Sequence, residues 1–86
     1  MSPQELNGWL KRDPYIPLRI HVAERLHYDV MNPNFVMVGN RVILIGLRRD
    51  IESPFFDEPV MVSMNHITRV EPIFEPTPPT PIPTPG

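Results

Sequence analysis

No cysteine occurs among the 86 residues of the chain, and glycine is scarce, with only four residues. Without cysteine there can be no disulfide, and thiolate-bound zinc, iron–sulfur and thiol chemistry are excluded. The chain also lacks any stretch close to the roughly 18 apolar residues that cross a membrane. Its first eleven residues do not have the basic and apolar layout of a signal peptide, so we expect a cytoplasmic protein with no membrane partner.

A strong charge of one sign is also lacking, since ten acidic residues face eight basic ones and the net charge is −2. Nucleic-acid binding driven by phosphate contacts is therefore not the first expectation. Catalytic signatures are absent too: there is no Gly-x-Ser-x-Gly, no His-Glu-x-x-His and no glycine-rich phosphate loop. We expect a protein that is not an enzyme and needs no cofactor. The composition does not exclude a substrate pocket formed between two subunits.

Proline is abundant, with thirteen residues, and seven of them lie in the last fifteen positions. Their distribution predicts a domain at residues 1–75 and a proline-rich tail at residues 76–86. A domain of this size buries only about 60% of the surface of its unfolded chain, so it is marginal without a staple or a partner. With disulfides excluded, self-association is the commonest remaining way to gain stability.

The predicted tail carries no charge and contains two PxxP spacings, Pro76 to Pro79 and Pro78 to Pro81. Aromatic-lined grooves recognise this spacing, but the tail lacks the flanking Arg or Lys that orients such ligands. We expect an extended, disordered, polyproline-type tail. It serves as a spacer, a solubilising segment or the remnant of a truncated domain, with a role as ligand as the alternative.

The first predicted element is a short helix. Ser2 suits the N-cap, Pro3 the first helical position and Glu5 the third, and apolar residues follow at helical spacing until Pro14 and Pro17 forbid continuation. From Pro17 the hydrophobic period becomes two, which predicts antiparallel strands at residues 18–22 and 26–30. A three-residue turn at 23–25 places both apolar sets on one face, at a strain of about 1 kcal/mol because it lacks glycine.

Further strands are predicted at residues 35–38, 41–47, 60–64 and 68–73. Residues 41–47 form the central strand, where Gly46 suggests a barrel corner, and Pro72 marks the last strand as an edge. Residues 65–67 are predicted to form one helical turn. The fold class is therefore mainly β: a short N-terminal helix and a five-stranded, strongly bent antiparallel small barrel of the SH3-like or Sm-like type.

Two adjacent aromatic residues, Phe55 and Phe56, interrupt the long polar loop at residues 48–59. Both rings cannot easily enter one small core, so we expect one of them to anchor a contact with a neighbouring subunit. In the same loop Arg48 and Arg49 form a basic pair that four acidic residues largely cancel. A solvated, salt-bridged loop is the first expectation for this pair, and a phosphate contact is the alternative.

Asn32 raises a second alternative, because Asp29, Met31 and Asn32 partly match the Asp and Met-Asn pattern of Sm-like proteins. Here one residue separates Asp29 from Met31 where that pattern has two, and the late Arg-Gly or Lys-Gly step is missing. Ordinary turn formation at residues 32–34 is the preferred interpretation. RNA or single-strand binding through Asn32, Arg48 and Arg49 is kept as the alternative.

His21 and His27 are placed opposite each other by the predicted register, on the outward face. Two imidazoles at this spacing could share a metal or act as a pH sensor, with only Asp29 or Glu24 nearby as further ligands. We expect them instead to be two exposed strand histidines without a special role. His66 is expected to complete its short turn.

The chain as a whole resembles a family of small hypothetical proteins abundant in planctomycetes. The resemblance rests on DPYIPLRIHVAERLHYDVMNPNFVMVGNRVILIGL and PVMVSMNHITRVEPI, within residues 3–74. That family usually has Asp-Gly where this sequence has Ala23 and Glu24, and it implies no function. The sequence thus predicts a non-catalytic, self-associating binding or assembly module, forming a homo-oligomer or binding an unidentified protein. The alternative is an Sm-like nucleic-acid-binding protein.

Overall fold

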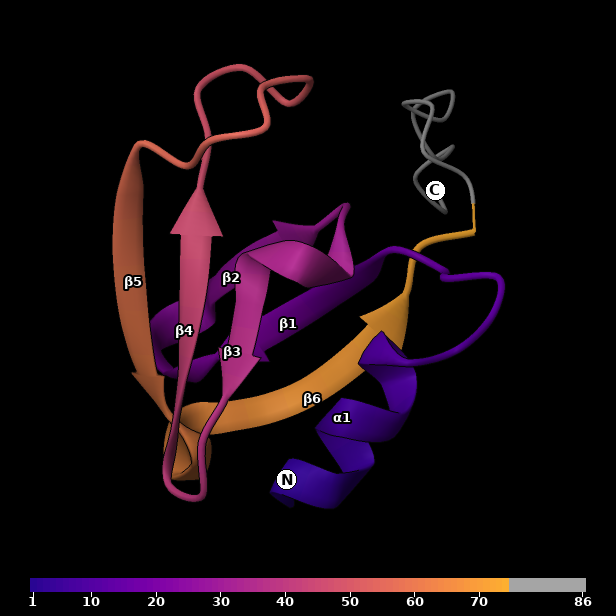
Figure 1. Ribbon diagram of the computed structural model, residues 1–86. Helices are drawn as coiled ribbons and strands as arrows, with labels where there is room; N and C mark the ends of the chain where they lie inside the picture. The colour runs from indigo at the N-terminus through magenta and orange to yellow at the C-terminus, as the bar shows by residue number, and fades with distance from the viewer. Residues whose placement is uncertain (75–86) are drawn as a thin grey trace, which may run out of the picture.

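The computed structural model describes residues 1–74 as one helix followed by six strands and three single-turn 3-10 helices (Figure 1). The helix is α1 (Pro3–Leu10), and the strands are β1 (Leu18–Val22), β2 (Leu26–Val30), β3 (Val36–Val38), β4 (Val42–Leu47), β5 (Glu58–Ser63) and β6 (Ile67–Pro72). The 3-10 helices are η1 (Ala23–Arg25), η2 (Pro33–Phe35) and η3 (Met64–His66). The tail predicted at residues 76–86 lies outside the described residues.

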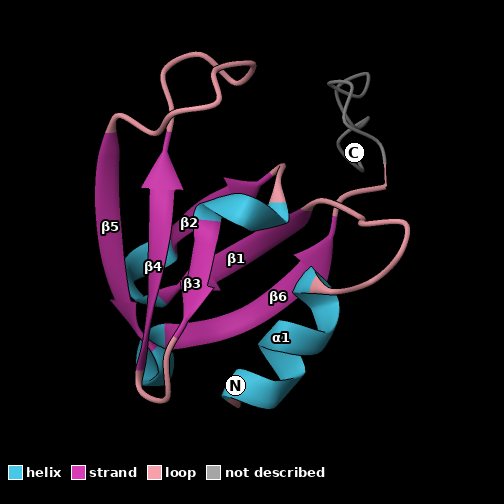
Figure 2. Ribbon diagram, in the orientation of Figure 1, coloured by secondary structure: helices cyan, strands magenta, loops and turns pink. Residues whose placement is uncertain are grey.

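The strands form two antiparallel sheets of three strands, in the orders β2-β1-β6 and β3-β4-β5 (Figure 2). The mainly β class, the N-terminal helix and the six segments predicted as strands are thereby confirmed, whereas the count of five strands given to the barrel is wrong. No strand pairing joins the two sheets within residues 1–74, so the predicted barrel is not closed there. The physical reason is η2, which begins at Pro33 and separates β2 from β3, where a closed barrel would have one continuous bent strand.

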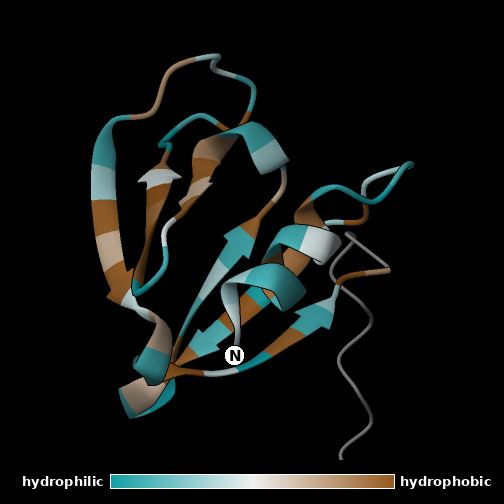
Figure 3. Cartoon of the chain, turned by 60° about the horizontal axis from the view of Figure 1, so that its bottom comes forward, coloured by the Kyte–Doolittle hydropathy of each residue, from teal (hydrophilic) through white to brown (hydrophobic). Residues whose placement is uncertain are grey.

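The core lies between the two sheets and is filled from both (Figure 3). β1 contributes Leu18 and Ile20, β4 contributes Ile43 and Ile45, and all four are at most 2% exposed. Alternate residues of these strands therefore point inward, as period two requires. α1 adds Leu6, which is fully buried, and closes one side of the core. Within residues 1–74, no helix is long and apolar enough to cross a membrane.

The start of α1 confirms the predicted cap. Ser2 Oγ accepts a hydrogen bond from the Glu5 backbone N–H at 3.1 Å and also bonds Glu5 Oε1 at 3.1 Å. The segment between α1 and β1 is fixed by Tyr15, whose hydroxyl donates to the Val30 carbonyl oxygen at 2.7 Å. Burial raises the pKa of Tyr15 to about 12. These contacts tie the N-terminal segment to the first sheet.

The turn between β1 and β2 has the predicted length and register, with Val22 opposite Leu26. Its strain is visible in the backbone, since Glu24 has φ 67° and Arg25 has φ 64°. Left-handed conformation costs a residue with a Cβ roughly 1 to 2 kcal/mol, and glycine avoids this cost. Two consecutive left-handed residues are also what a tight hairpin with an Asn-Gly or Asp-Gly pair provides.

The double variant Glu24→Asn with Arg25→Gly is expected to raise the free energy of unfolding by about 1 kcal/mol, because it relieves this strain. Urea denaturation measures the change. Ala23→Gly is the matched control: Ala23 is not among the described residues with positive φ, so this glycine should lower stability. Equal effects of the two changes would show that the backbone angles of Glu24 and Arg25 do not carry the strain.

Candidate functional site

The outward faces of the two sheets differ sharply in character. Along β1, β2 and β6 the outward positions alternate with the buried ones and are all charged or titratable: Arg19, His21, His27, Asp29, Arg69 and Glu71. We call this set the charged face. Along β3, β4 and β5 the outward positions contain no charged side chain: Met37, Val42, Leu44, Gly46, Pro59, Met61 and Ser63. We call this set the apolar face.

A row of three large apolar side chains crosses the middle of the apolar face. Met37 pairs with Leu44, and Leu44 pairs with Met61, so the three residues lie side by side on neighbouring strands. Met37 is 69% exposed and Met61 is 67% exposed. Methionine is enriched in protein interfaces, where its flexible thioether adapts to a partner. The row is therefore an unpartnered apolar surface built on regular secondary structure.

Phe55 and Phe56 extend the apolar face at the end of β4. Phe55 is 76% exposed and Phe56 is 54% exposed, so neither ring enters the core. The sequence predicted that only one of the two rings would stay outside. Phe56 packs on Gly46, where an added Cβ would lie 2.9 Å from the Phe56 Cβ and 3.3 Å from the Phe35 ring. The register with β5 runs through Gly46 without a shift. Gly46 therefore makes room for aromatic rings, and the pairing shows no bulge at this position, which was predicted as a barrel corner.

These aromatic residues surround a hollow of about 560 Å³ at the loop end of the apolar face. Its walls are Phe35, Phe55 and Phe56, with Asn32 and Asn34 among the polar residues that line it. We call it the aromatic hollow. The Oδ1 atom of Asn32 accepts a hydrogen bond from the Asn34 backbone N–H at 2.9 Å, which confirms the predicted turn at residues 32–34. The side-chain NH₂ group of Asn32 is left as a donor.

A second hollow of about 540 Å³ lies on the other side of Phe35 and brings together Asn32, Arg48 and Arg49. The Arg48 guanidinium carbon lies 4.0 Å from the centre of the Phe35 ring, and Arg48 Nη1 donates to the Ser53 carbonyl oxygen at 2.9 Å. The structure thus joins three residues that sequence reasoning had grouped only by analogy. Sequence reasoning had missed Phe35, whose place at the end of η2 gave no signal of a site.

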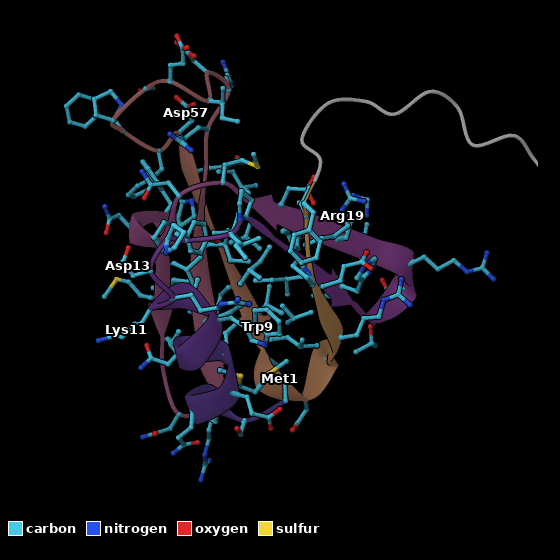
Figure 4. All side chains as sticks on the ribbon, turned by 90° about the vertical axis from the view of Figure 1, so that its right-hand side faces the viewer. Met1, Trp9, Lys11, Asp13, Arg19 and Asp57 are labelled. Atoms are coloured by element: carbon cyan, nitrogen blue, oxygen red, sulfur yellow. The ribbon has the colours of Figure 1, made fainter. Side chains whose placement is uncertain are left out.

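The acidic residues of the same loop bind backbone amides. Asp57 Oδ2 accepts from the Arg49 backbone N–H at 2.7 Å, and Asp50 Oδ1 accepts from the Glu52 N–H at 2.9 Å. Ion pairs in residues 1–74 occur only on the charged face, so the predicted salt-bridged loop is wrong. In Figure 4 the loop with Asp57 lies far from Arg19 on the first sheet. The two candidate regions are therefore separate.

The charged face confirms the predicted register, since His21 lies opposite His27 with ring centres 5.7 Å apart. Sequence reasoning missed its main partner, Glu71, which comes from β6 and lies 2.7 Å from His21 Nε2. Arg19 pairs with Asp29, with two hydrogen bonds of 2.7 and 3.0 Å. Within residues 1–74, no group of three or more His, Cys, Asp or Glu side chains is placed to hold a metal.

These pairs predict how stability changes in acid. The hydrogen bond from Arg19 lowers the pKa of Asp29, and the hydrogen bond with His21 lowers the pKa of Glu71. A carboxylate with a depressed folded-state pKa stabilises the fold above its unfolded pKa, and this contribution is lost as the pH falls through the folded value. Stability should thus fall between about pH 5 and pH 3.

Urea denaturation at several pH values measures this loss, with Asp29→Asn as the comparison. The variant should lose less stability on acidification than the unchanged protein does, because its side chain cannot be protonated. The difference is small, since an exposed pair of this kind contributes less than about 1 kcal/mol. Parallel pH profiles would contradict a role for the Arg19–Asp29 pair.

Comparisons with known proteins found no match for the chain. No family model matches it, and neither the curated proteins nor the solved structures give a significant match. The resemblance to small hypothetical proteins and the likeness to Sm-like or SH3-like barrels therefore stay predictions.

Proposed function

We propose that this protein is a non-catalytic assembly module that associates with a second copy of itself through the apolar face. The observation that carries the proposal is the row of the exposed Met37 and Met61 with the half-buried Leu44 between them, on a face without charge. A two-fold pair requires a surface that is complementary to itself. An uncharged face meets this requirement, whereas a face of one charge sign would repel its own copy.

The size of the domain supports the same proposal. Residues 1–74 form one small core without a disulfide, and a domain of this size gains stability by burying further apolar surface. Two strands of six residues, β4 and β5, and one of three, β3, give this face an area of roughly 240 Å². Stable complexes bury about 800 Å² on each partner, so the Phe55–Phe56 loop must contribute and the affinity should be micromolar.

The sheet edges favour contact through the face over lateral pairing of strands. Two of the four edge strands, β5 and β6, each contain a proline, Pro59 and Pro72, whereas the edge strands β2 and β3 contain none. Proline has no N–H to donate and protects edges against strand addition. Ring assembly by edge pairing, in the Sm-like manner, is therefore the less favoured form of self-association.

Sedimentation velocity of the full chain over a range of micromolar concentrations tests the proposal. The weight-average mass should rise with concentration from one chain toward two. A single species with the mass of one chain over the whole range would contradict self-association.

RNA or single-strand binding is the second candidate, because one hollow contains Asn32, Arg48 and Arg49 beside the Phe35 ring. Aromatic rings and arginines are the groups on which unpaired bases stack. The likeness to Sm-like proteins supports this candidate only by element order, with a helix first and a single 3-10 turn before the last strand. The net charge of −2 makes it the weaker proposal.

Filter binding of a single-stranded oligonucleotide at several salt concentrations decides between the candidates. A phosphate-contacting surface gives an affinity that falls steeply with salt. Arg48→Ala should then weaken binding, whereas Arg41→Ala should not, since Arg41 precedes β4 and lies at its opposite end. Absence of binding at low salt would remove this candidate and leave self-association untouched.

A further inference from the structure

The aromatic hollow has a lining that suits one kind of ligand. Three phenylalanine rings and the side chains of Pro54 and Pro59 line it, and no lining residue is charged. Ligands in the polyproline II conformation dock in such aromatic grooves, because their preformed shape loses little entropy on binding. An Arg or Lys in the ligand would find no carboxylate here. The hollow therefore selects an uncharged proline-rich segment.

This chain contains such a segment at residues 76–85. Six of its ten residues are proline, none is charged, and its PxxP spacings are those of groove ligands. The missing flanking Arg or Lys, which speaks against a conventional acidic groove, agrees with this uncharged hollow. The uncharged, aromatic hollow and the uncharged, proline-rich segment therefore match each other in charge and in residue type.

We propose that the aromatic hollow binds residues 76–85 of the same chain. Eleven residues lie between Phe74 and the end of this segment, and at 3.1 Å per residue they reach about 34 Å, so the last prolines of the segment can occupy the hollow while the earlier residues bridge the distance to it. A tethered ligand has a high effective concentration, which favours the hollow of its own chain over that of a neighbour.

The polar residues of the hollow add a specific contact. A polyproline II backbone makes no internal hydrogen bonds, so its carbonyl oxygens need donors from the groove. The Asn32 side-chain NH₂ group can donate, because its Oδ1 is already held by the Asn34 backbone N–H. Asn32 thereby gains a role in this protein that does not involve a nucleic-acid base.

The absence of cysteine allows a direct test on the full chain. Thr80→Cys provides a single site for a nitroxide spin label, which weakens the NMR signals of amides close to it. The signals of Phe35, Gly46 and Phe55 should lose most of their intensity, whereas those on the charged face should keep theirs. When Phe55 and Phe56, both exposed, are changed to serine, the amide signals around the hollow should keep their intensity. Leu26→Ser, an exposed apolar residue on the other sheet, is the matched control and should still show the loss of intensity.

Two outcomes would overturn the proposal. One is a loss of intensity that is even over the surface or is unchanged by the serine variants. The other is loss that also occurs when spin-labelled chains without ¹⁵N are mixed with ¹⁵N-labelled chains, since the segment then binds a neighbouring molecule. The hollow includes Met37, Leu44, Phe55 and Phe56, which also belong to the surface proposed for self-association. The segment and a second copy therefore compete for this surface. The spin-label experiment is done at a concentration where sedimentation shows one chain, so a failure of this proposal is distinguishable from a failure of self-association.

Discussion

Replacing Met37 and Met61 by glutamate is expected to convert the self-associated protein into a folded monomer. Both side chains are mostly exposed, so the change should not disturb the core. In a two-fold contact the new carboxylates would be buried without partners, and an unpaired buried charge costs about 3 kcal/mol or more. The dissociation constant should therefore rise by at least roughly a hundredfold. Sedimentation velocity measures the change.

Leu26→Glu is the matched control for this prediction, because Leu26 is also an exposed apolar residue, at 52%, but belongs to the other sheet. It should leave the mass unchanged. Self-association also adds to stability by mass action, so the unfolding temperature should depend on concentration in the control and not in the double variant. A double variant that keeps the mass of the unchanged protein would place the contact elsewhere.

Ile43→Ala should lower the free energy of unfolding by about 2 to 5 kcal/mol, the second large effect. Ile43 is 0% exposed and is the second residue of β4, paired with Val38 of β3 and Val62 of β5, so the lost methyl groups leave a cavity that neighbouring strands cannot close. A small domain has little stability to lose, and this variant should be largely unfolded at room temperature. Urea denaturation followed by circular dichroism measures the change.

Leu44→Ala is the matched comparison for this second prediction. Leu44 is the next residue of β4 and faces outward beside Met37 and Met61. The substitution therefore removes a similar side-chain volume without opening a cavity in the core. Its effect on the unfolding of a single chain should be well below that of Ile43→Ala, and its main effect should be on self-association. Equal losses of stability would contradict the assignment of the two faces of β4.

Local features of the fold were predictable because they depend on neighbouring residues. The N-cap at Ser2, the hairpin with Val22 opposite Leu26 and the central position of β4 each follow from residues close in sequence. Alternation with period two also assigns inward and outward positions strand by strand. What alternation could not give is the partner of each strand across the molecule.

The long-range pairing decided what sequence reasoning missed. β6 pairs with β1 from about fifty residues away, and only this pairing brings Glu71 to His21. Gly46 shows the same limit: its glycine is explained by the ring of Phe56, ten residues later, and not by the local backbone. A prediction from spacing cannot see contacts that depend on how two sheets are placed.

The sequence predicted which residues belong to the candidate site better than it predicted how they are arranged. One of Phe55 and Phe56 was expected to stay outside the core because two adjacent rings do not fit one small core, and both are exposed. Asn32, Arg48 and Arg49 were expected only by analogy, and they share one hollow because η2 and the end of β4 lie together. The row of methionines was not expected, since Met37 and Met61 lie on strands whose pairing was unknown.

The central claim is that the apolar face is buried against a second copy, and isotope-filtered NMR tests it most directly. Chains with ¹³C-labelled methionine methyl groups are mixed with unlabelled chains, so that only contacts between molecules are detected. The account predicts intermolecular contacts from the methyl groups of Met37 and Met61, and none from Met64, which is buried in the core. Intermolecular contacts that avoid Met37 and Met61, or none at all, would contradict it.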